Sequence, residues 1–370
     1  MMHLFNSSTA YRLAGSLVAA TLYTAGPCAA ADSAVEAFYR GREVRFVLST
    51  SLSGGYGTYA KTLQPFLEKY LPGKPRVVIQ LMPGAGGLVA ANWLANVAPK
   101  DGSVIAMVHR SAVSTAPLFG VPNTRFDPTA FGWIGSMNSD ISVCITWHSA
   151  AVKTFADLKT IPAVFGGVGA GSDIDMAPNM LNNLFDTQMQ LVTGYSNSDS
   201  IHIAMERGEV DGRCGWAVGS LLATKPHWLR DRQINVLVQI GLKKHRALPD
   251  VPLLRDMTTD PELQNVIDTI VAPLQVIARP VLTTPGVPPE RLAALRQAFD
   301  DAMADPDFQA QADRIHLEYE HVSGAEVEDV IRRIYAMPKP IIAAAADAMQ
   351  RIDKTKVIQK GGAAPARSNQ

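Results

Sequence analysis

A repeated order of β-branched segment, glycine-rich loop and helix-spaced apolar segment begins at residue 44. Val44 to Thr50 (VRFVLST) is apolar and β-branched, which predicts a buried strand. The glycine-rich stretch Ser51 to Gly57 follows, and apolar residues then recur at helical spacing from Tyr59 to Tyr70. The same order recurs between Arg76 and Val97. This spacing predicts parallel βαβ units and so restricts the fold to the α/β class.

A second group of such units indicates a second lobe. Strand, loop and helix segments alternate again between Ser142 and Ile240. We therefore expect two similar lobes, each with a parallel-rich sheet flanked by helices. Lobe 2 (143–246) is inserted between two parts of lobe 1 (32–142 and 247–353).

Later segments complete this prediction. A further strand is expected at Leu274 to Arg279, and helices are expected between Glu290 and Met349. The chain should cross between the lobes near 137–143 and near 241–251, and two such connections permit hinge closure. The glycine- and proline-containing tail, 354–370, is expected to be disordered.

The first 31 residues are typical of an export signal. Arg12 is the only charged residue before Asp32, and an apolar run from Leu13 to Tyr23 follows it. Ala29 and Ala31 fit the small-x-small rule, so cleavage is expected before Asp32. The run is too short to span a bilayer comfortably, although an uncleaved anchor is the alternative. We expect a periplasmic protein with a cleaved signal peptide, residues 1–31.

Charge and cysteine content limit the kinds of binding partner and metal site that this chain can have. Lys plus Arg and Asp plus Glu are both 34, which gives no bulk electrostatic case for nucleic acid or an anionic membrane. Cys144 and Cys214 remain after cleavage and could pair in an exported protein, or both could be buried free thiols. Neither lies in a zinc-like spacing, so no metal site is expected.

Three glycine-rich loops are the candidate ligand site. Ser53 to Thr58, Pro83 to Gly87, and Gly169 to Asp173 each join a predicted strand to a helix. Ligands of open parallel sheets bind beyond the carboxyl ends of the strands, where helix N-termini offer N–H donors to anions. None of the loops contains Lys or Arg, which suits a carboxylate better than a polyphosphate. Any one loop could be only a tight turn, but three predict a shared cleft.

Enzyme signatures are weak. The chain contains neither GxxxxGK[ST] nor GxSxG, and no nucleophile–base pair is evident. His109 and His148 are isolated, which favours structural or solvent-facing roles. We expect a binding protein without catalytic residues and without a cofactor.

Several motifs, in order, resemble a known family. They are the first glycine loop, Pro83 to Gly87 (PGAGG), Ala98 to Gly102 (APKDG), Gly208 to Gly212 (GEVDG), Leu248 to Pro252 (LPDVP) and Thr284 to Pro288 (TPGVP). Together they resemble the receptors of the tripartite tricarboxylate transporters, also called the Bug family, over roughly Tyr39 to Met349.

The resemblance implies a two-lobe periplasmic binding protein fold (type II-like), hinged and without metal or organic cofactor. It implies a monomer that captures a small organic acid and delivers it to membrane transporter subunits. The alternatives are a ligand sensor that docks onto a membrane protein, and a small-molecule enzyme on a similar fold.

The resemblance also implies site residues. In the family, two loops of the first lobe hold a carboxylate through backbone groups and bridging waters; these correspond to Ser53, Gly54, Gly55, Tyr56, Thr58, Ala85, Gly86 and Gly87. The second lobe supplies discriminating contacts, which correspond to Gly171, Ser172, Asp173, Tyr195 and Trp216. Many members of the family have an Asp at the end of the first glycine loop, where this chain has Tyr59. The family name therefore does not identify the ligand.

Asp173 has two alternative roles. Facing the cleft, it would repel a second ligand carboxylate but accept a hydrogen bond from a hydroxyl, amine or amide. Otherwise it only caps the helix that is expected to begin near Asp175.

We predict that Gly86→Val abolishes ligand binding without unfolding the protein, because a side chain would block the approach of a ligand to the loop backbone. Titration calorimetry on the folded variant measures the loss. Unchanged affinity would contradict the assignment.

Overall fold

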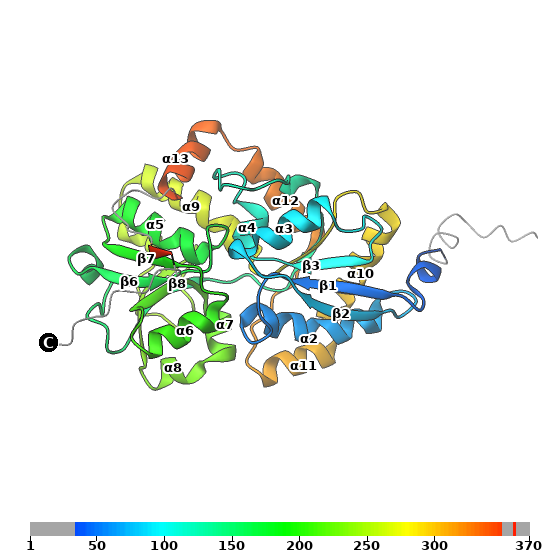
Figure 1. The fold of residues 1–370 in the computed structure, drawn as a ribbon, viewed down its shortest axis with the longest axis horizontal. Helices are drawn as coiled ribbons and strands as arrows, with labels where there is room; N and C mark the ends of the chain where they lie inside the picture. The colour runs from blue at the N-terminus through cyan, green and yellow to red at the C-terminus, as the bar shows by residue number, and fades with distance from the viewer. Residues whose placement is uncertain (1–33, 350–357, 360–370) are drawn as a thin grey trace, which may run out of the picture.

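The computed structural model describes residues 34–349 and 358–359, which form two lobes side by side (Figure 1). The predicted signal peptide lies outside these residues. Lobe 1 is built on a six-stranded sheet in the order β11-β4-β10-β3-β1-β2. Its strands are β1 (Glu43–Leu48), β2 (Arg76–Leu81), β3 (Val104–Met107), β4 (Gly132–Ser136), β10 (Pro280–Thr283) and β11 (Val322–Ser323).

Lobe 2 has its own six-stranded sheet, in the order β12-β7-β6-β8-β5-β9. Its strands are β5 (Ser142–Trp147), β6 (Ala163–Gly166), β7 (Met189–Thr193), β8 (Gly212–Ala217), β9 (Ile234–Ile240) and β12 (Ile358–Gln359). The two sheets share one plan. In lobe 1, β10 runs antiparallel to its two neighbours, β3 and β4. In lobe 2, β5 runs antiparallel to its two neighbours, β8 and β9. Both β10 and β5 are separated in sequence from the strands with which they pair.

Burial on both faces explains the apolar strands. In β1, Phe46 and Leu48 pack on one side of the sheet and Val47 packs on the other. Helices cover both sides, so the strand shows a continuous apolar run rather than polar alternation. The α/β fold with two lobes is confirmed, with mixed sheets in which most strands run in one direction.

The helices form layers on both sides of each sheet (Figure 1). Those of lobe 1 are α2 (Gly55–Tyr70), α3 (Leu88–Asn96), α4 (Arg110–Ser114), α10 (Pro289–Ala304), α11 (Pro306–Arg314) and α12 (Gly324–Tyr335). Those of lobe 2 are α5 (Asp173–Phe185), α6 (Ser198–Glu206), α7 (Val218–Thr224) and α8 (Pro226–Arg230). Two more, α9 (Pro261–Val276) and α13 (Lys339–Met349), contribute to a hydrophobic cluster that includes residues of both lobes.

The chain crosses from lobe 1 to lobe 2 and back, and after α12 it reaches lobe 2 again, where β12 joins the sheet. The first crossover joins β4 to β5 through residues 137–141, and the second runs through the end of α9 into β10. They lie together, because Met137 N–H donates to the Arg279 carbonyl at 3.1 Å and Asp140 N–H donates to that of Gln275 at 3.1 Å. The second crossover lies later in the chain than expected, since Gln239 bridges Leu253 and keeps the intervening segment on lobe 2.

Two local expectations differ from the structure. The strand expected at Leu274 to Arg279 is wrong, because α9 continues to Val276 and β10 begins only at Pro280. Within the tail that we expected to be disordered, β12 pairs in parallel with β7.

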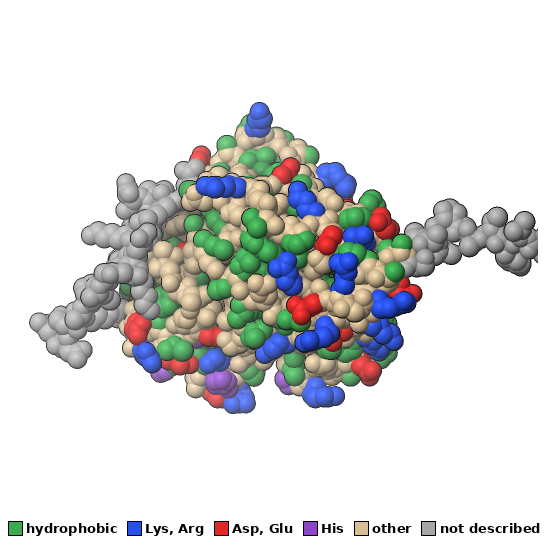
Figure 2. Space-filling model, turned by 45° about the vertical axis from the view of Figure 1, so that its right-hand side comes forward, with side chains coloured by type: hydrophobic (Ala, Val, Ile, Leu, Met, Phe, Trp, Pro, Cys, Tyr) green, Lys and Arg blue, Asp and Glu red, His purple; other side chains and the backbone are tan. Residues whose placement is uncertain are grey.

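Charges are distributed without a dominant sign. Basic and acidic side chains are interspersed over the face shown in Figure 2, in keeping with equal numbers of each. Among the described residues, no helix is long and apolar enough to cross a membrane.

A disulfide joins Cys144 on β5 to Cys214 on β8. The strands are antiparallel neighbours, and the two Cα atoms are 3.9 Å apart. Both residues are fully buried. Of the two alternatives from the sequence, the structure therefore has the bonded pair rather than two free thiols.

We predict that the double variant Cys144→Ala/Cys214→Ala is less stable than the wild type. The bond joins residues 70 apart in sequence, and losing it should lower the unfolding free energy by up to about 4 kcal/mol. The expected fall in Tm, measured by calorimetry, is roughly 10 °C. A reductant should lower the Tm of the wild type but not that of the double variant. Equal Tm values would contradict a stabilising role.

Candidate functional site

A small cavity lies where the two lobes meet. Lobe 1 and its crossover contribute Gly55, Tyr56, His109, Arg110 and Arg279; lobe 2 contributes Asp173, Ile174, Ser198, Arg213, Gly215, Trp216, Ala217 and Ser220. Its volume is about 30 Å³, enough for one or two water molecules. The lobes must therefore separate before a small organic molecule can enter.

The strand ends position the cavity wall. Gly55 and Tyr56 begin the helix after β1, and His109 and Arg110 follow β3. Asp173 begins the helix after β6. These are the carboxyl ends of strands, where open α/β sheets bind ligands.

A buried ion pair joins the lobes across the cavity. Arg110 of α4 donates to Asp173 Oδ2 from Nη2 at 2.6 Å and from Nε at 3.0 Å. Arg110 Nη1 donates to the Leu274 carbonyl at 2.9 Å. Burial alone would raise the pKa of Asp173, but the charge and hydrogen bonds of Arg110 lower it. Both groups are therefore charged and mutually satisfied.

Asp173 lines the cavity, but it does not cap the helix. The Ser172 side chain caps α5 by accepting from Ile174 N–H at 3.1 Å. The Asp173 carboxylate is instead turned to Arg110 of the other lobe. Its charge is neutralised there, so it holds the lobes together.

Arg279 forms a second part of the wall from the crossover. Its guanidinium lies over the rings of Tyr56 and Tyr59, at 4.7 and 4.8 Å from the ring centroids. It donates to Ser220 of lobe 2 and lies 3.8 Å from a carboxylate oxygen of Asp140. Its buried Nε has no hydrogen-bond partner among the described residues.

Arg213 is the third buried cation of the cavity. It lies on β8 with 1% of its surface exposed. Nη1 contacts His202 Nε2 at 3.2 Å, and Nε donates to the Cys214 carbonyl at 3.4 Å. No carboxylate of the described chain forms an ion pair with Arg213. Burial lowers the pKa of Arg213 to about 10, so the side chain stays cationic at neutral pH.

Two histidines near the cavity are neutral. Burial lowers the pKa of both His109 and His202 to about 4. His109 lines the cavity beside the Tyr56 ring, with 4.8 Å between ring centroids, and its Nδ1 has no partner among the described residues. The prediction from the sequence missed this residue and all three arginines.

The residues predicted from the sequence divide into two groups. Gly55, Tyr56, Asp173 and Trp216 line the cavity. The remaining predicted residues do not line it: Ser53, Gly54, Thr58, Ala85, Gly86, Gly87, Gly171, Ser172 and Tyr195. Tyr195 is buried in a cluster with Trp216 and Trp228, and Ser53 donates to Asp199 across the lobes.

Two glycine loops meet each other rather than open space. A Cβ on Gly86, whose φ is 64°, would lie 2.6 Å from the Gly169 carbonyl oxygen and 2.6 Å from Ser172 N. Ser111 Oγ also donates to the Gly171 carbonyl at 2.9 Å across the same boundary. Glycine is required here for close backbone approach of the lobes. The expected effect of Gly86→Val is unchanged, but the structure gives blocked closure as its cause.

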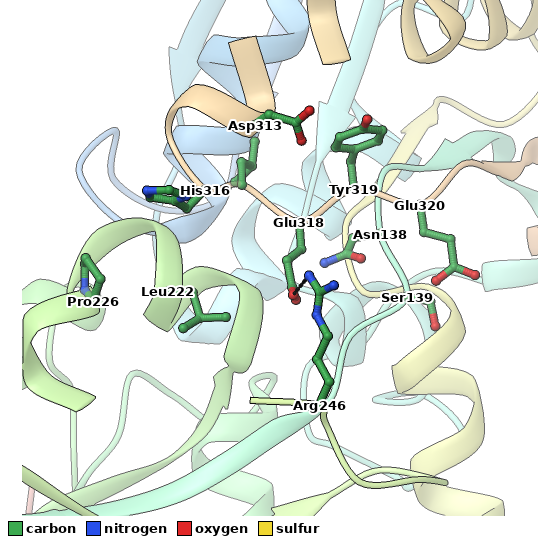
Figure 3. A pocket seen from close by; sticks show the side chains of 11 residues that line it. Asn138, Ser139, Leu222, Pro226, Arg246, Asp313, His316, Glu318, Tyr319 and Glu320 are labelled. Atoms are coloured by element: carbon green, nitrogen blue, oxygen red, sulfur yellow. Dashed lines mark hydrogen bonds and ion pairs between the residues drawn. The ribbon is translucent and has the colours of Figure 1, made fainter. Parts of the chain in front are cut away.

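A larger cavity, about 530 Å³, lies elsewhere on the lobe boundary (Figure 3). Leu222 and Pro226 lie on one side of it, and Asp313 and His316 on the other. Arg246 and Glu318 form an ion pair there at 3.2 Å. Its lining has three carboxylates, Asp313, Glu318 and Glu320, and one arginine, so it suits an organic anion less well than the arginine-lined cavity. Within the described residues, no group of three His, Cys, Asp or Glu side chains could hold a metal ion.

We predict that Asp173→Asn weakens binding of every small acid that the wild type binds and leaves their ranking unchanged. The change removes the charge that satisfies buried Arg110, at a cost of about 2 kcal/mol to the closed state, which is roughly 30-fold in affinity. Titration calorimetry with a panel of acids measures it. Asp231→Asn, at an exposed ion pair with Arg230, is the control and should have no effect. A changed ranking would show that Asp173 contacts the ligand directly.

This chain is similar to known proteins in sequence and in fold. A protein of Cupriavidus necator, described as "UPF0065 protein in gbd 5'region", is 21% identical over 315 residues, covering 81% of this chain and 86% of its own. The solved structure of the periplasmic binding protein BugD matches with a TM-score of 0.66 at 18% identity, covering 82% of this chain and 96% of its own.

A second solved structure is MatC from Rhodopseudomonas palustris with bound malate. It matches with a TM-score of 0.65 at 17% identity, over 84% of this chain and 99% of its own. The model of the tripartite tricarboxylate transporter family receptor matches residues 60–346. The two-lobe fold, the cavity between the lobes and this match over most of the sequence place the chain in the tripartite tricarboxylate transporter receptor family.

Proposed function

We propose that this protein is a periplasmic receptor that captures a small carboxylate between its lobes and delivers it to membrane transporter subunits. The observation that carries the proposal is the cavity itself. Arg110, Arg213 and Arg279 converge on it from both lobes and the crossover, and all three are buried. One of them has no carboxylate partner in the described chain, so an anion would complete the site.

Family membership supports the transport role. The matched family consists of receptors of a transporter, and the relative MatC was solved with bound malate. The proposal includes export through a cleaved signal peptide, residues 1–31, a monomeric receptor, and binding without chemical turnover.

Lobe movement supports capture. The cavity of this ligand-free arrangement holds only about 30 Å³, so the lobes must move apart to admit an organic acid and close around it with a wider cavity, and two adjacent crossovers provide a hinge. A ligand that contacts both lobes binds the closed form better than the open form and shifts the equilibrium toward closure.

We predict that native mass spectrometry of protein purified without dialysis detects a bound small acid at one per chain. Small-angle scattering should show a smaller radius of gyration with this acid than after its removal by unfolding and refolding. Deletion of the gene should abolish uptake of the same acid. Intact uptake in the deletion strain, or turnover of the bound compound, would contradict the proposal.

A further inference from the structure

Arg213 is a buried cation whose charge is not balanced locally. An isolated charge in a protein interior costs several kcal/mol unless a counter-ion or hydrogen bonds compensate it. Arg110 has Asp173 at 2.6 Å, and Arg279 has Asp140 at 3.8 Å. Among the described residues, Arg213 has hydrogen bonds only to the His202 ring and a backbone carbonyl; its guanidinium lies 5.4 Å from the centroid of the Trp216 ring, and it forms no ion pair.

Asp199 does not supply the missing partner. Its Oδ1 lies 3.7 Å from His202 Nδ1, so the His202 ring stands between Asp199 and Arg213. Asp199 also accepts from Ser53 of lobe 1, and 30% of its side chain is exposed to solvent. Asp173, whose charge also acts on Arg213, is hydrogen-bonded to Arg110 instead, so Arg213 has no paired carboxylate among the described residues.

Arg213 has donors left for that ligand. Its hydrogen bonds to described residues use Nε and Nη1, which leaves the Nη2 group on a side chain that lines the cavity. The unpartnered Nε of Arg279 adds a second guanidinium donor on the same cavity. Guanidinium groups match the planar geometry of a carboxylate.

The rest of the wall offers a second carboxylate no separate cation. Arg110 is already occupied by Asp173, and the free Nε of Arg279 serves the same small cavity as Arg213, so the two guanidinium groups share one carboxylate. The remaining surface is formed largely by Tyr56, Trp216, Ile174 and the neutral imidazole of His109. Such a surface suits an aromatic or aliphatic group.

We infer that Arg213 binds the carboxylate of the ligand, and that the ligand carries only this one carboxylate on an uncharged apolar or aromatic body. The inference rests on the proposed function and specifies its substrate class. It also places the carboxylate on a side chain of lobe 2 rather than on the glycine loops of lobe 1.

The test compares acids that share a skeleton but differ in charge. Hexanoate, adipate and hexanamide form one set, and benzoate, terephthalate and benzamide form another. Each is titrated by calorimetry into protein stripped of ligand by unfolding and refolding. We expect a monocarboxylate to bind at least tenfold more tightly than its dicarboxylate partner and at least 100-fold more tightly than its amide.

Variants of Arg213 test the anchor. Arg213→Gln should weaken binding of the monocarboxylate at least 100-fold, and Arg213→Lys, which keeps the charge but loses the planar fork, at least tenfold. If Arg213→Gln does not fold, Arg213→Lys provides the test. Arg230→Gln, on the same lobe with 73% of its side chain exposed, should bind like the wild type.

Two kinds of failure are distinguishable. Tighter binding of a dicarboxylate, or wild-type affinity in folded Arg213→Gln, would overturn the inference and leave the receptor function standing. Failure of every acid to bind, with no acid co-purifying, would overturn both. Where an acid co-purifies, its exact mass identifies it, and two carboxylates in that compound would likewise overturn the inference.

Discussion

A buried charge pair joins the two lobes across their contact. Arg110 belongs to lobe 1 and Asp173 to lobe 2, and both side chains are buried where the lobes meet. Removing two charges from water is costly, and their attraction offsets the cost only when the geometry is good. Two hydrogen bonds to one oxygen and a third to a backbone carbonyl provide that geometry. The pair therefore aligns the lobes while adding little net stability to closure.

When the lobes are closed without a ligand, buried positive charge remains without an ion-pair partner. Arg213 is also buried at this boundary and has no ion-paired carboxylate among the described residues, and the buried Nε of Arg279 has no hydrogen-bond partner among them. An anionic ligand supplies that charge only in the closed form, and this differential interaction is what a hinged receptor needs. The Arg110–Asp173 pair is complete within the protein and aligns the lobes. Arg213 lacks a paired carboxylate and therefore makes closure depend on an anionic ligand.

The sequence predicted the parts of this arrangement that depend on local pattern. Apolar β-branched runs such as Val44 to Thr50 identify strands buried on both faces, and glycine-rich loops mark the strand ends where Gly55, Tyr56 and Asp173 reach the cavity. The spacing did not reveal β10, because its pairing with β3 and β4 joins segments more than 130 residues apart in sequence.

The arginines were missed for a related reason. Arg213 is a charged residue within a strand, a signal that could have marked it, but its lack of a partner is visible only once the lobes are assembled. Local pattern also marked the glycines as positions of close backbone approach, but it did not show what approaches them. Gly86 meets the backbone of Gly169 and Ser172, two residues that only the tertiary fold brings near.

Arg279 has a double position in this molecule. Its side chain lines the cavity and also links the lobes, because it donates to Ser220 of lobe 2 and lies 3.8 Å from a carboxylate oxygen of Asp140 in the first crossover. The apparent affinity of such a receptor is its intrinsic affinity multiplied by the fraction of molecules able to close. A substitution at Arg279 therefore changes both factors together, so a lineage that adapts to a new nutrient through this residue also alters how often its empty receptor closes.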